Sequence, residues 1–250
     1  MTMVGARRVA GAETGAADHS ATGGQAPEPA IEDRLAIADL MTGWIHRDLS
    51  EWDLMRELFH PGGVIEITWF DGLFSDFVDA SAGMAASDLR TKHLIGSPLI
   101  TFNGHRALVE TNAMIVGENV RLALGCTTHN RFYDRVERRG GAWKIVNRQS
   151  IYDMASFSFP TGVVELEQDL IGRYPREYAA LAYLLQKSGF PVTRVFATKG
   201  SALEREMKTS AAAWLLDRKE PADDLVDRMR AGLLHVAATR PSTASRSATS

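Results

Sequence analysis

The side chains of this chain that are suited to chemistry are histidines, carboxylates and arginines. Cys126 is the only cysteine among 250 residues, so the sequence offers neither an internal disulfide nor a multi-cysteine metal site. The seven histidines are scattered without the spacing of a metal-binding triad. A neutral imidazole removes a proton near pH 7, and a carboxylate beside it fixes its tautomer and stabilises the imidazolium that forms. These residue types therefore favour acid–base chemistry without a metal.

His93 is the main candidate, because it lies in a stretch with strand character rather than in a turn. Further residues offer aromatic rings for stacking or polar groups for hydrogen bonding. The candidates for contacting a substrate are Trp44, Trp69, Phe70, Asn112, His129, Arg131 and Tyr152. On their strand, His129 and Arg131 share one face, whereas Asn130 and Phe132 share the other. The alternation leaves open which of the two faces lines a pocket.

Length and composition exclude several classes of protein. The chain is 45% hydrophobic and 24% charged with a net charge of −3, which are ordinary globular values. It has no basic excess for gripping nucleic acid, and no stretch approaches the roughly 18 apolar residues of a membrane span. The single cysteine fits a reducing compartment, so we expect a cytoplasmic location. Residues 1–30 and 239–250 are rich in small and polar residues and are expected to be disordered.

The first part of the chain after residue 30 is helical in pattern. Apolar residues recur at steps of three and four, which predicts a helix that ends near Asp48. Ser50 begins a stretch that is similar to a capping box, Pro61-Gly62-Gly63 stops the helix that follows, and Ser75 is a further candidate cap. The predicted elements are helices over 31–48, 52–59 and 75–86 and a strand over 64–68.

The next part of the chain is rich in strand signals. Asn103-Gly104 is a strong hairpin turn, and Gly140-Gly141 marks another turn. The predicted strands run over 92–102, 106–116, 120–137 and 142–157. Helices followed by hairpin-linked strands predict an α+β domain with a strongly curved antiparallel sheet. A curved sheet that helices cover on one side encloses a pocket.

Residues 161–238 are read as a helical extension of this domain. The predicted helices run over 166–171, 175–187, 201–216 and 223–237. The segment 174–185 carries three tyrosines and many apolar residues, so it must cover a surface. The outer face of the sheet, a neighbouring subunit and the mouth of the pocket are the three alternatives. We expect the extension to act as an oligomer contact or as a lid.

The order of these elements resembles the cone fold of the nuclear-transport-factor-2-like, or SnoaL-like, superfamily, and in particular its scytalone-dehydratase-like branch. Three stretches within residues 31–157 carry the resemblance. They are Ile37-Ala38-Asp39-Leu40 with Asp48 and Trp52-Asp53, His93 with Gly96, Pro98, Leu99 and Ile100, and the segment from Phe132-Tyr133-Asp134-Arg135 to Trp143-Lys144-Ile145 and Arg148. The resemblance implies a cone domain over residues 31–160.

The resemblance also implies roles for three residues. A histidine at the place of His93 acts as the general base, and its aspartate partner lies where Asp48 falls. Arg148 matches an arginine near the leaving group, where it stabilises developing negative charge. No metal or organic cofactor is implied. Related lyases often carry a tyrosine or lysine five residues before the aspartate, where this chain has Gly43, and we expect this glycine to enlarge the pocket.

These features predict a cofactor-independent lyase that eliminates water, halide or formaldehyde from a hydrophobic substrate, with an aromatic one favoured. An isomerase or cyclase working in the same pocket is one alternative. A non-catalytic ligand-binding protein, such as the small subunit of a ring-hydroxylating dioxygenase, is the other, because this fold hosts all three. The expected partners are the substrate and further copies of the chain in a homodimer or homotrimer, with neither nucleic acid nor membrane.

Overall fold

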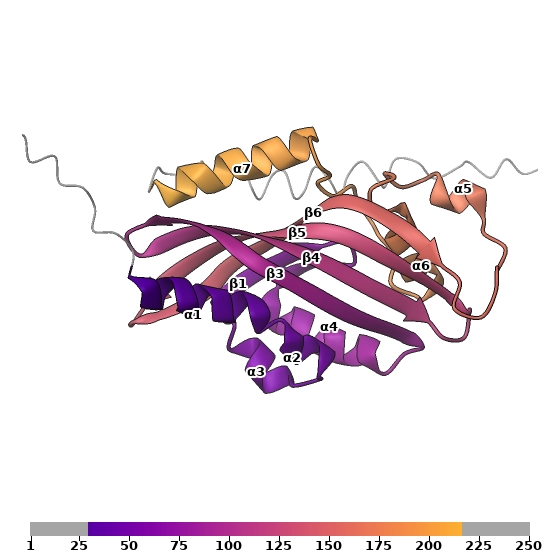
Figure 1. Ribbon diagram of the computed structural model, residues 1–250, viewed down its shortest axis with the longest axis horizontal. Coiled ribbons are helices and arrows are strands. Elements are labelled where there is room, and N and C mark those ends of the chain that lie inside the picture. The colour runs from indigo at the N-terminus through magenta and orange to yellow at the C-terminus, as the bar shows by residue number, and fades with distance from the viewer. Residues whose placement is uncertain (1–29, 217–250) are drawn as a thin grey trace, which may run out of the picture.

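The computed structural model describes residues 30–216 and shows a curved six-stranded sheet with helices against both faces (Figure 1). The predicted α+β class is confirmed. The helices are α1 (Ile31–Thr42), α2 (Ile45–Asp48), α3 (Trp52–Arg56), α4 (Phe74–Ala85), α5 (Gln168–Ile171), α6 (Ala179–Lys187) and α7 (Ala202–Leu215). The strands are β1 (Phe59–Ile67), β2 (Phe70–Leu73), β3 (Leu89–Asn103), β4 (Arg106–Asn119), β5 (Leu124–Arg139) and β6 (Ala142–Ser158). The helix predicted over 223–237 and the predicted tails (1–29 and 239–250) lie outside the described residues.

The sheet has the strand order β2-β1-β6-β5-β4-β3. Strands β3, β4, β5 and β6 follow one another along the chain, and each forms an antiparallel hairpin with the next. β1 joins β6 in parallel, and the other neighbours are antiparallel. The predicted hairpin at Asn103-Gly104 forms, with Gly104 and His105 at its tip. Gly104 and Gly140 have φ values of 60° and 57°, a region in which glycine is favoured because it lacks a Cβ. The turn chemistry in the sequence therefore sets the register of the long strands.

Several predicted boundaries are wrong in detail. The helix expected over 31–48 is interrupted at Gly43, and its last turn is the separate helix α2. Neither Ser50 nor Ser75 is a cap, since Glu51 and Leu73 occupy the N-cap positions of α3 and α4 without a side-chain hydrogen bond. Pro61-Gly62-Gly63 does not end the preceding helix, because α3 already ends at Arg56 and these three residues lie inside β1, at a shift in its pairing with β6.

The strand predicted over 120–137 is also shorter at its start than expected. It begins at Leu124, because the chain turns before that residue and Ala123 has a φ of 52°. Strand propensity alone does not reveal this turn, since Val120 is apolar and the turn contains no proline.

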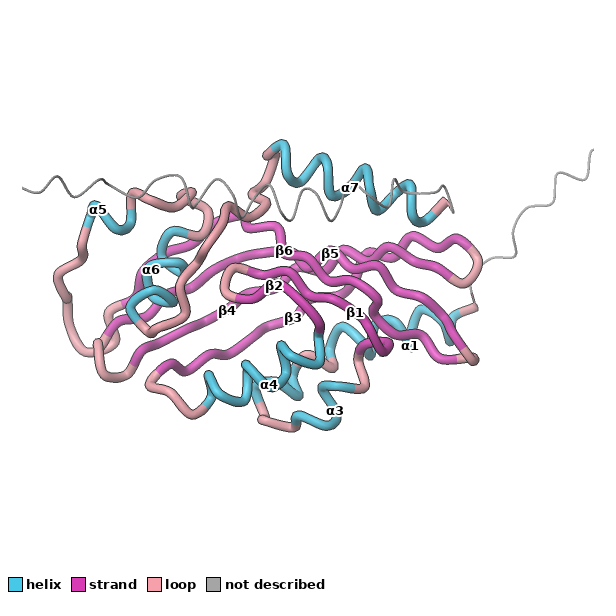
Figure 2. Tube along the Cα trace, turned by 180° about the vertical axis from the view of Figure 1, so that it is seen from behind, coloured by secondary structure: helices cyan, strands magenta, loops and turns pink. Residues whose placement is uncertain are grey.

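Helices pack against both faces of the sheet, which we call the inner and the outer face (Figures 1 and 2). Helices α1 to α4 cover one end of the inner face, where Ile37 and Met41 pack into the main core. Helix α6 covers the other end and shares a core with Cys126 and Tyr152 of the sheet. Helix α7 lies on the outer face, where Met207 and its neighbours pack on the sheet. None of the helices among residues 30–216 is long and apolar enough to cross a membrane.

Candidate active site

Asp48, the last residue of α2, and His93 of β3 form a buried pair at the inner face. Nδ1 of His93 lies 2.7 Å from Oδ1 of Asp48, and the backbone N–H of His93 donates to Oδ2 at 2.7 Å. The side chains are 6% and 0% exposed. Both carboxylate oxygens are therefore engaged by one residue, which holds the ring in one orientation. With the Nδ1–H donating to the carboxylate, Nε2 keeps its lone pair and is the basic nitrogen.

Asp48 lies at the C-terminal end of α2, where a carboxylate needs a compensating partner. A carboxylate at the end of a helix faces the negative end of the helix dipole and is disfavoured there. Here the imidazole and backbone N–H of His93 offset that effect. His93 is held in turn by the pairing of β3 with β4, in which it lies opposite Ile115.

The pKa values of the two groups depart from their ordinary values in a direction that suits a base. Burial, which disfavours the charged imidazolium, lowers the pKa of His93 despite the nearby carboxylate. Burial raises the pKa of Asp48, but the hydrogen bonds from His93 and the charge of Arg47 bring it below its ordinary value. At neutral pH the pair therefore consists of a neutral imidazole and a carboxylate.

A small cavity of about 40 Å³ lies beside His93. Its wall is mainly apolar and comes from both halves of the described chain, including Trp44, Trp69, Phe132, Tyr152, Leu181 and Leu185. Arg47, Thr68 and Thr91 add polar groups to it. This volume is enough for a water molecule but not for a drug-sized ligand, whose sites have volumes of roughly 300–1,000 Å³. A ligand of that size would therefore enter only if the cavity widens.

Comparisons with known proteins agree with this architecture. Residues 29–149 match the family model described as a SnoaL-like domain. The matched residues, just under half of the chain, are similar to a SnoaL-like domain. Among curated proteins, Pea pathogenicity protein 2 of Fusarium vanettenii is 28% identical over 181 residues, which cover 68% of this chain and 76% of that protein.

Solved structures similar to this chain include two whose names state an activity. One is a candidate scytalone dehydratase from Novosphingobium aromaticivorans, with 18% identity, a TM-score of 0.46, and coverage of 54% of this chain and 97% of that one. The other is a hexachlorocyclohexane dehydrochlorinase, with 16% identity, a TM-score of 0.45, and coverage of 55% and 95%.

Three of the predicted substrate contacts line the cavity beside His93. They are Trp44, Trp69 and Tyr152. The hydroxyl of Tyr152 accepts from the backbone N–H of Thr68 at 3.1 Å and donates to its side-chain oxygen at 3.2 Å. Phe70 does not line the cavity but packs edge-to-face on Trp69, so it supports the wall.

Arg148 is buried behind the cavity wall rather than in it. Its guanidinium makes two hydrogen bonds of 2.8 Å to Asp134, and both side chains are fully buried. The guanidinium carbon lies 4.7 Å from the ring centroid of Trp44 and 4.3 Å from that of Phe132. Arg148 therefore supports two rings that line the cavity, and it is not itself part of the cavity wall.

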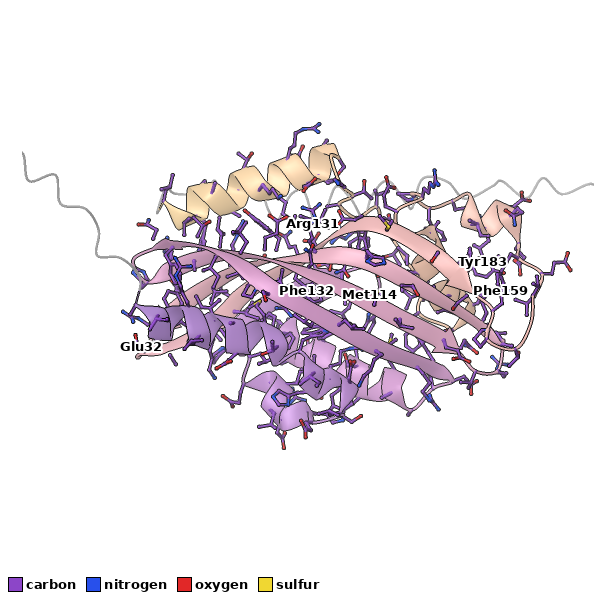
Figure 3. All side chains as sticks on the ribbon, in the orientation of Figure 1. Glu32, Met114, Arg131, Phe132, Phe159 and Tyr183 are labelled. Atoms are coloured by element: carbon purple, nitrogen blue, oxygen red, sulfur yellow. The ribbon has the colours of Figure 1, made fainter. Side chains whose placement is uncertain are left out.

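Asn112, His129 and Arg131 lie on the outer face of the sheet, so their placement in the pocket is corrected. Their register explains the result: Asn112 lies opposite Arg131, whereas the inner-face residue Thr111 lies opposite Phe132. Arg131 extends toward α7, unlike its neighbour Phe132 (Figure 3).

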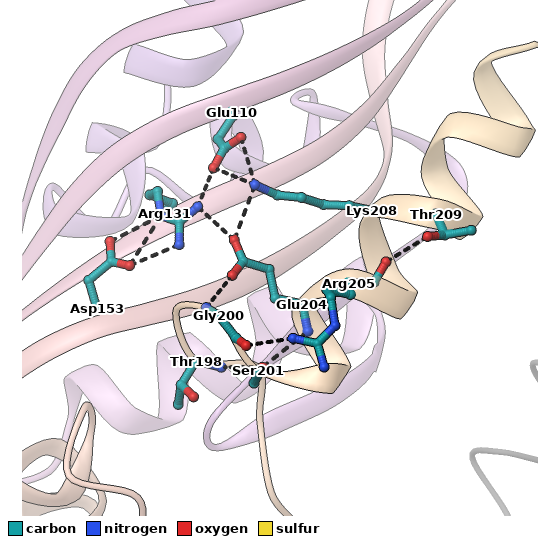
Figure 4. A network of polar contacts seen from close by, with 10 residues as sticks. All are labelled: Glu110, Arg131, Asp153, Thr198, Gly200, Ser201, Glu204, Arg205, Lys208 and Thr209. Atoms are coloured by element: carbon teal, nitrogen blue, oxygen red, sulfur yellow. Dashed lines mark hydrogen bonds and ion pairs between the residues drawn. The ribbon is translucent and has the colours of Figure 1, made fainter.

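Arg131 is committed to a network that fastens α7 to the outer face (Figure 4). Its guanidinium binds Asp153 at 2.9–3.2 Å, Glu204 at 2.9 Å, and also Glu110. Lys208 of α7 reaches Glu110 and Glu204. Arg131 therefore has a structural role on the outer face of the sheet, opposite the face on which His93 lines the cavity.

Gly43 does not enlarge the cavity as expected. It is not part of the wall, and a Cβ added to it would lie 2.5 Å from Cδ2 of Leu58. Glycine at this position therefore permits close packing between the first helix and the segment after α3.

Sequence reasoning missed several residues of the wall, most of all Arg47, Thr91, Leu181 and Leu185. Two of them had a detectable signal, since Arg47 adjoins Asp48 and Thr91 shares the parity of His93 on β3. The two leucines of α6 belong to the segment 174–185, for which the mouth of the pocket is one of three predicted alternatives, and only the fold decides between them by bringing that helix to the inner face. Across residues 30–216, no cluster of three or more His, Cys, Asp or Glu side chains is arranged to hold a metal ion.

The burial of His93 predicts a loss of stability in mild acid. An unfolded histidine gains its proton near pH 6.5, whereas the folded state resists protonation of His93 down to a lower pH. The free energy of unfolding should therefore fall as the pH decreases through 6.5 toward the pKa of the folded state. Urea unfolding between pH 5 and 8 measures this effect, and His93→Gln should lose that part of the pH dependence. The same slope in both proteins would contradict the assignment.

Proposed function

We propose that this protein is a cofactor-independent lyase in which His93 acts as the general base. The observation that carries the proposal is the imidazole of His93, whose Nδ1 is held by buried Asp48 beside a small, mainly apolar cavity. Burial keeps the imidazole neutral at neutral pH, so that Nε2 is free to accept a proton, and the mainly apolar wall limits exchange of that proton with solvent.

In the proposed reaction, Nε2 of His93 takes a proton from a carbon of the substrate. The electron pair of the C–H bond becomes the new π bond, and the leaving group departs from the neighbouring carbon with its own bonding pair. Water leaves after hydroxide takes a proton from the imidazolium, and halide leaves as the anion. For loss of formaldehyde, the base takes the proton of a CH2OH hydroxyl instead, and the O–H electron pair becomes the C=O bond of formaldehyde. The electron pair of the broken C–C bond then becomes the new π bond as the leaving group departs from the neighbouring carbon. Asp48 stabilises the imidazolium in each case.

The aromatic side chains of the wall favour a hydrophobic, ring-containing substrate. Arg148 holds the rings of Trp44 and Phe132 in this proposal, so we describe it as a positioning residue. The family match supports a small-molecule enzyme of this kind, and the dehydrochlorinase among the similar structures eliminates halide by its name.

The test uses 5-nitrobenzisoxazole, a carbon acid that needs only a base. Removal of its ring C–H proton forms the nitrile and breaks the N–O bond, which leaves a coloured nitrophenolate. We expect the wild-type protein to catalyse this ring opening and His93→Gln to lose it. Equal rates for the two proteins, or no rate above buffer for the wild type, would refute the general base. With natural substrates, a lighter product indicates elimination and a product of unchanged mass indicates an isomerase.

The packing of helix α6 on the cavity leads to a second prediction, which concerns substrate access, because Leu181 and Leu185 form part of the cavity wall. Leu185→Ala should widen the cavity and raise kcat/KM for 5-nitrobenzisoxazole several-fold, while lowering stability by about 2–5 kcal/mol. Leu203→Ala, at an exposed position of α7, is the matched control and should change neither quantity. A destabilised Leu185→Ala variant with unchanged kcat/KM would show that α6 does not limit access.

A further inference from the structure

Arg47 is a buried arginine in the cavity wall whose neighbours leave its charge largely unmatched. The residue is 8% exposed. Its Nη1 donates to the hydroxyl of Thr91 at 2.7 Å, and its Nη2 lies 3.4 Å from the sulfur of Met84. A hydroxyl is neutral, and a thioether is a weak acceptor. Arg148, the other buried arginine of this region, has instead a carboxylate that takes two of its hydrogen bonds.

The guanidinium of Arg47 is charged at neutral pH. Burial lowers its pKa to about 10, and the negative charge of Asp48 partly opposes that effect. Within residues 30–216, no carboxylate oxygen forms an ion pair with it. A guanidinium carries five N–H donors, so two contacts leave most of its capacity available beside the cavity.

Arg47 and His93 flank the same small space. Thr91, which receives the hydrogen bond from Arg47, is two residues before His93 on β3 and points to the same face. Side chains two residues apart along a strand are roughly 6–7 Å apart. A single small molecule can therefore present a C–H group to the imidazole and an oxygen to the guanidinium.

We propose that Arg47 is a catalytic residue that binds the oxygen on which negative charge collects when His93 removes the proton. This inference rests on the proposed function and specifies its substrate class, a neutral carbon acid activated by a carbonyl group. Proton transfer to Nε2 turns the carbonyl into an enolate, with the C–H electron pair in the new C=C bond and the charge on oxygen.

The charges of the cavity wall favour a neutral substrate over an anionic one. In the resting state, the carboxylate of Asp48 has the charge of Arg47 nearby, and the imidazole is neutral. When the imidazole gains its proton, Asp48 has a full ion-pair partner, and the guanidinium of Arg47, which no carboxylate pairs with, matches the new oxyanion. A guanidinium that strengthens its interaction only as charge develops stabilises the transition state more than the ground state. A carboxylate substrate would instead bring a second negative charge close to Asp48 before any reaction.

The experiment measures how 4-nitrophenol ionises when bound to the full chain, because its phenolate imitates the enolate and absorbs visible light. The wild-type protein should bind the phenolate form, with a bound pKa below that in Arg47→Gln by at least about one unit, a tenfold effect. Arg47→Lys should keep part of the shift, since it keeps the charge. Arg56→Gln, at an exposed arginine that pairs with Asp79, is the control and should match the wild type.

The outcomes separate this inference from the proposed function. Equal bound pKa values in wild type and Arg47→Gln, or no binding of 4-nitrophenol by the wild type, would overturn the role of Arg47. If His93→Gln abolishes ring opening of 5-nitrobenzisoxazole while Arg47→Gln leaves the bound pKa unchanged, the base stands and the oxyanion role fails. A shifted pKa with no ring opening in the wild type would support the anion site and refute the base. Preference for benzoate over 4-nitrophenolate would contradict the neutral substrate class.

Discussion

Replacing His93 with glutamine is expected to lower kcat/KM for ring opening of 5-nitrobenzisoxazole by about 10²–10⁴-fold, the usual contribution of a positioned general base. Glutamine keeps a polar side chain of similar reach but has no basic nitrogen. The rate is followed as nitrophenolate absorbance, and a near-ultraviolet circular dichroism spectrum shows whether the core is intact. A folded variant with near-full turnover would remove His93 from the mechanism.

Asp48→Asn should cause a loss of comparable size for a different reason. Asp48 accepts one hydrogen bond on each oxygen, from the backbone N–H and from Nδ1 of His93. An amide offers one acceptor and one donor, so a single N–H of His93 loses its acceptor. The ring then turns, or adopts the tautomer in which Nε2 carries the proton, as the equivalent change does in serine proteases. The double variant should lose little more than either single variant, because the pair acts as a unit.

Breaking the ion pair between Asp134 and Arg148 is expected to have the largest effect on stability. Both side chains are fully buried, and two hydrogen bonds of 2.8 Å join them. Asp134→Ala leaves a buried guanidinium without a counter-charge, and such single losses cost roughly 3–5 kcal/mol. Urea unfolding at pH 7 measures the change, with Asp88→Ala at the exposed pair with Arg121 as the control.

The double variant Asp134→Leu with Arg148→Met tests why Asp134→Ala is expected to lose folding stability. If uncompensated charge is responsible, removing both charges should recover much of the stability, because apolar replacements of buried pairs are often neutral. A double variant as unstable as Asp134→Ala would instead assign the loss to packing around Trp44 and Phe132. A single variant with wild-type stability would contradict the buried ion pair itself.

The sequence by itself determined the class of fold and most of its long helices and strands. Asn103-Gly104 and Gly140-Gly141 marked turns that the structure contains, because a positive φ leaves few alternatives to glycine. It also supplied Asp48 and His93 as a candidate pair through a family resemblance, and the structure places the two side chains in contact.

The tertiary structure alone decided which residues share the cavity. Alternation along β5 put His129 and Arg131 on one face and Asn130 and Phe132 on the other, but a period of two carries no information on which face is inside. That choice depends on what packs there: α7 binds Arg131 through Glu204, and α6 brings Leu181 and Leu185 to His93 from about 90 residues away. The position of Arg47 in the cavity wall also depends on the tertiary structure, because only the approach of α2 to β3 makes Arg47 a neighbour of Thr91.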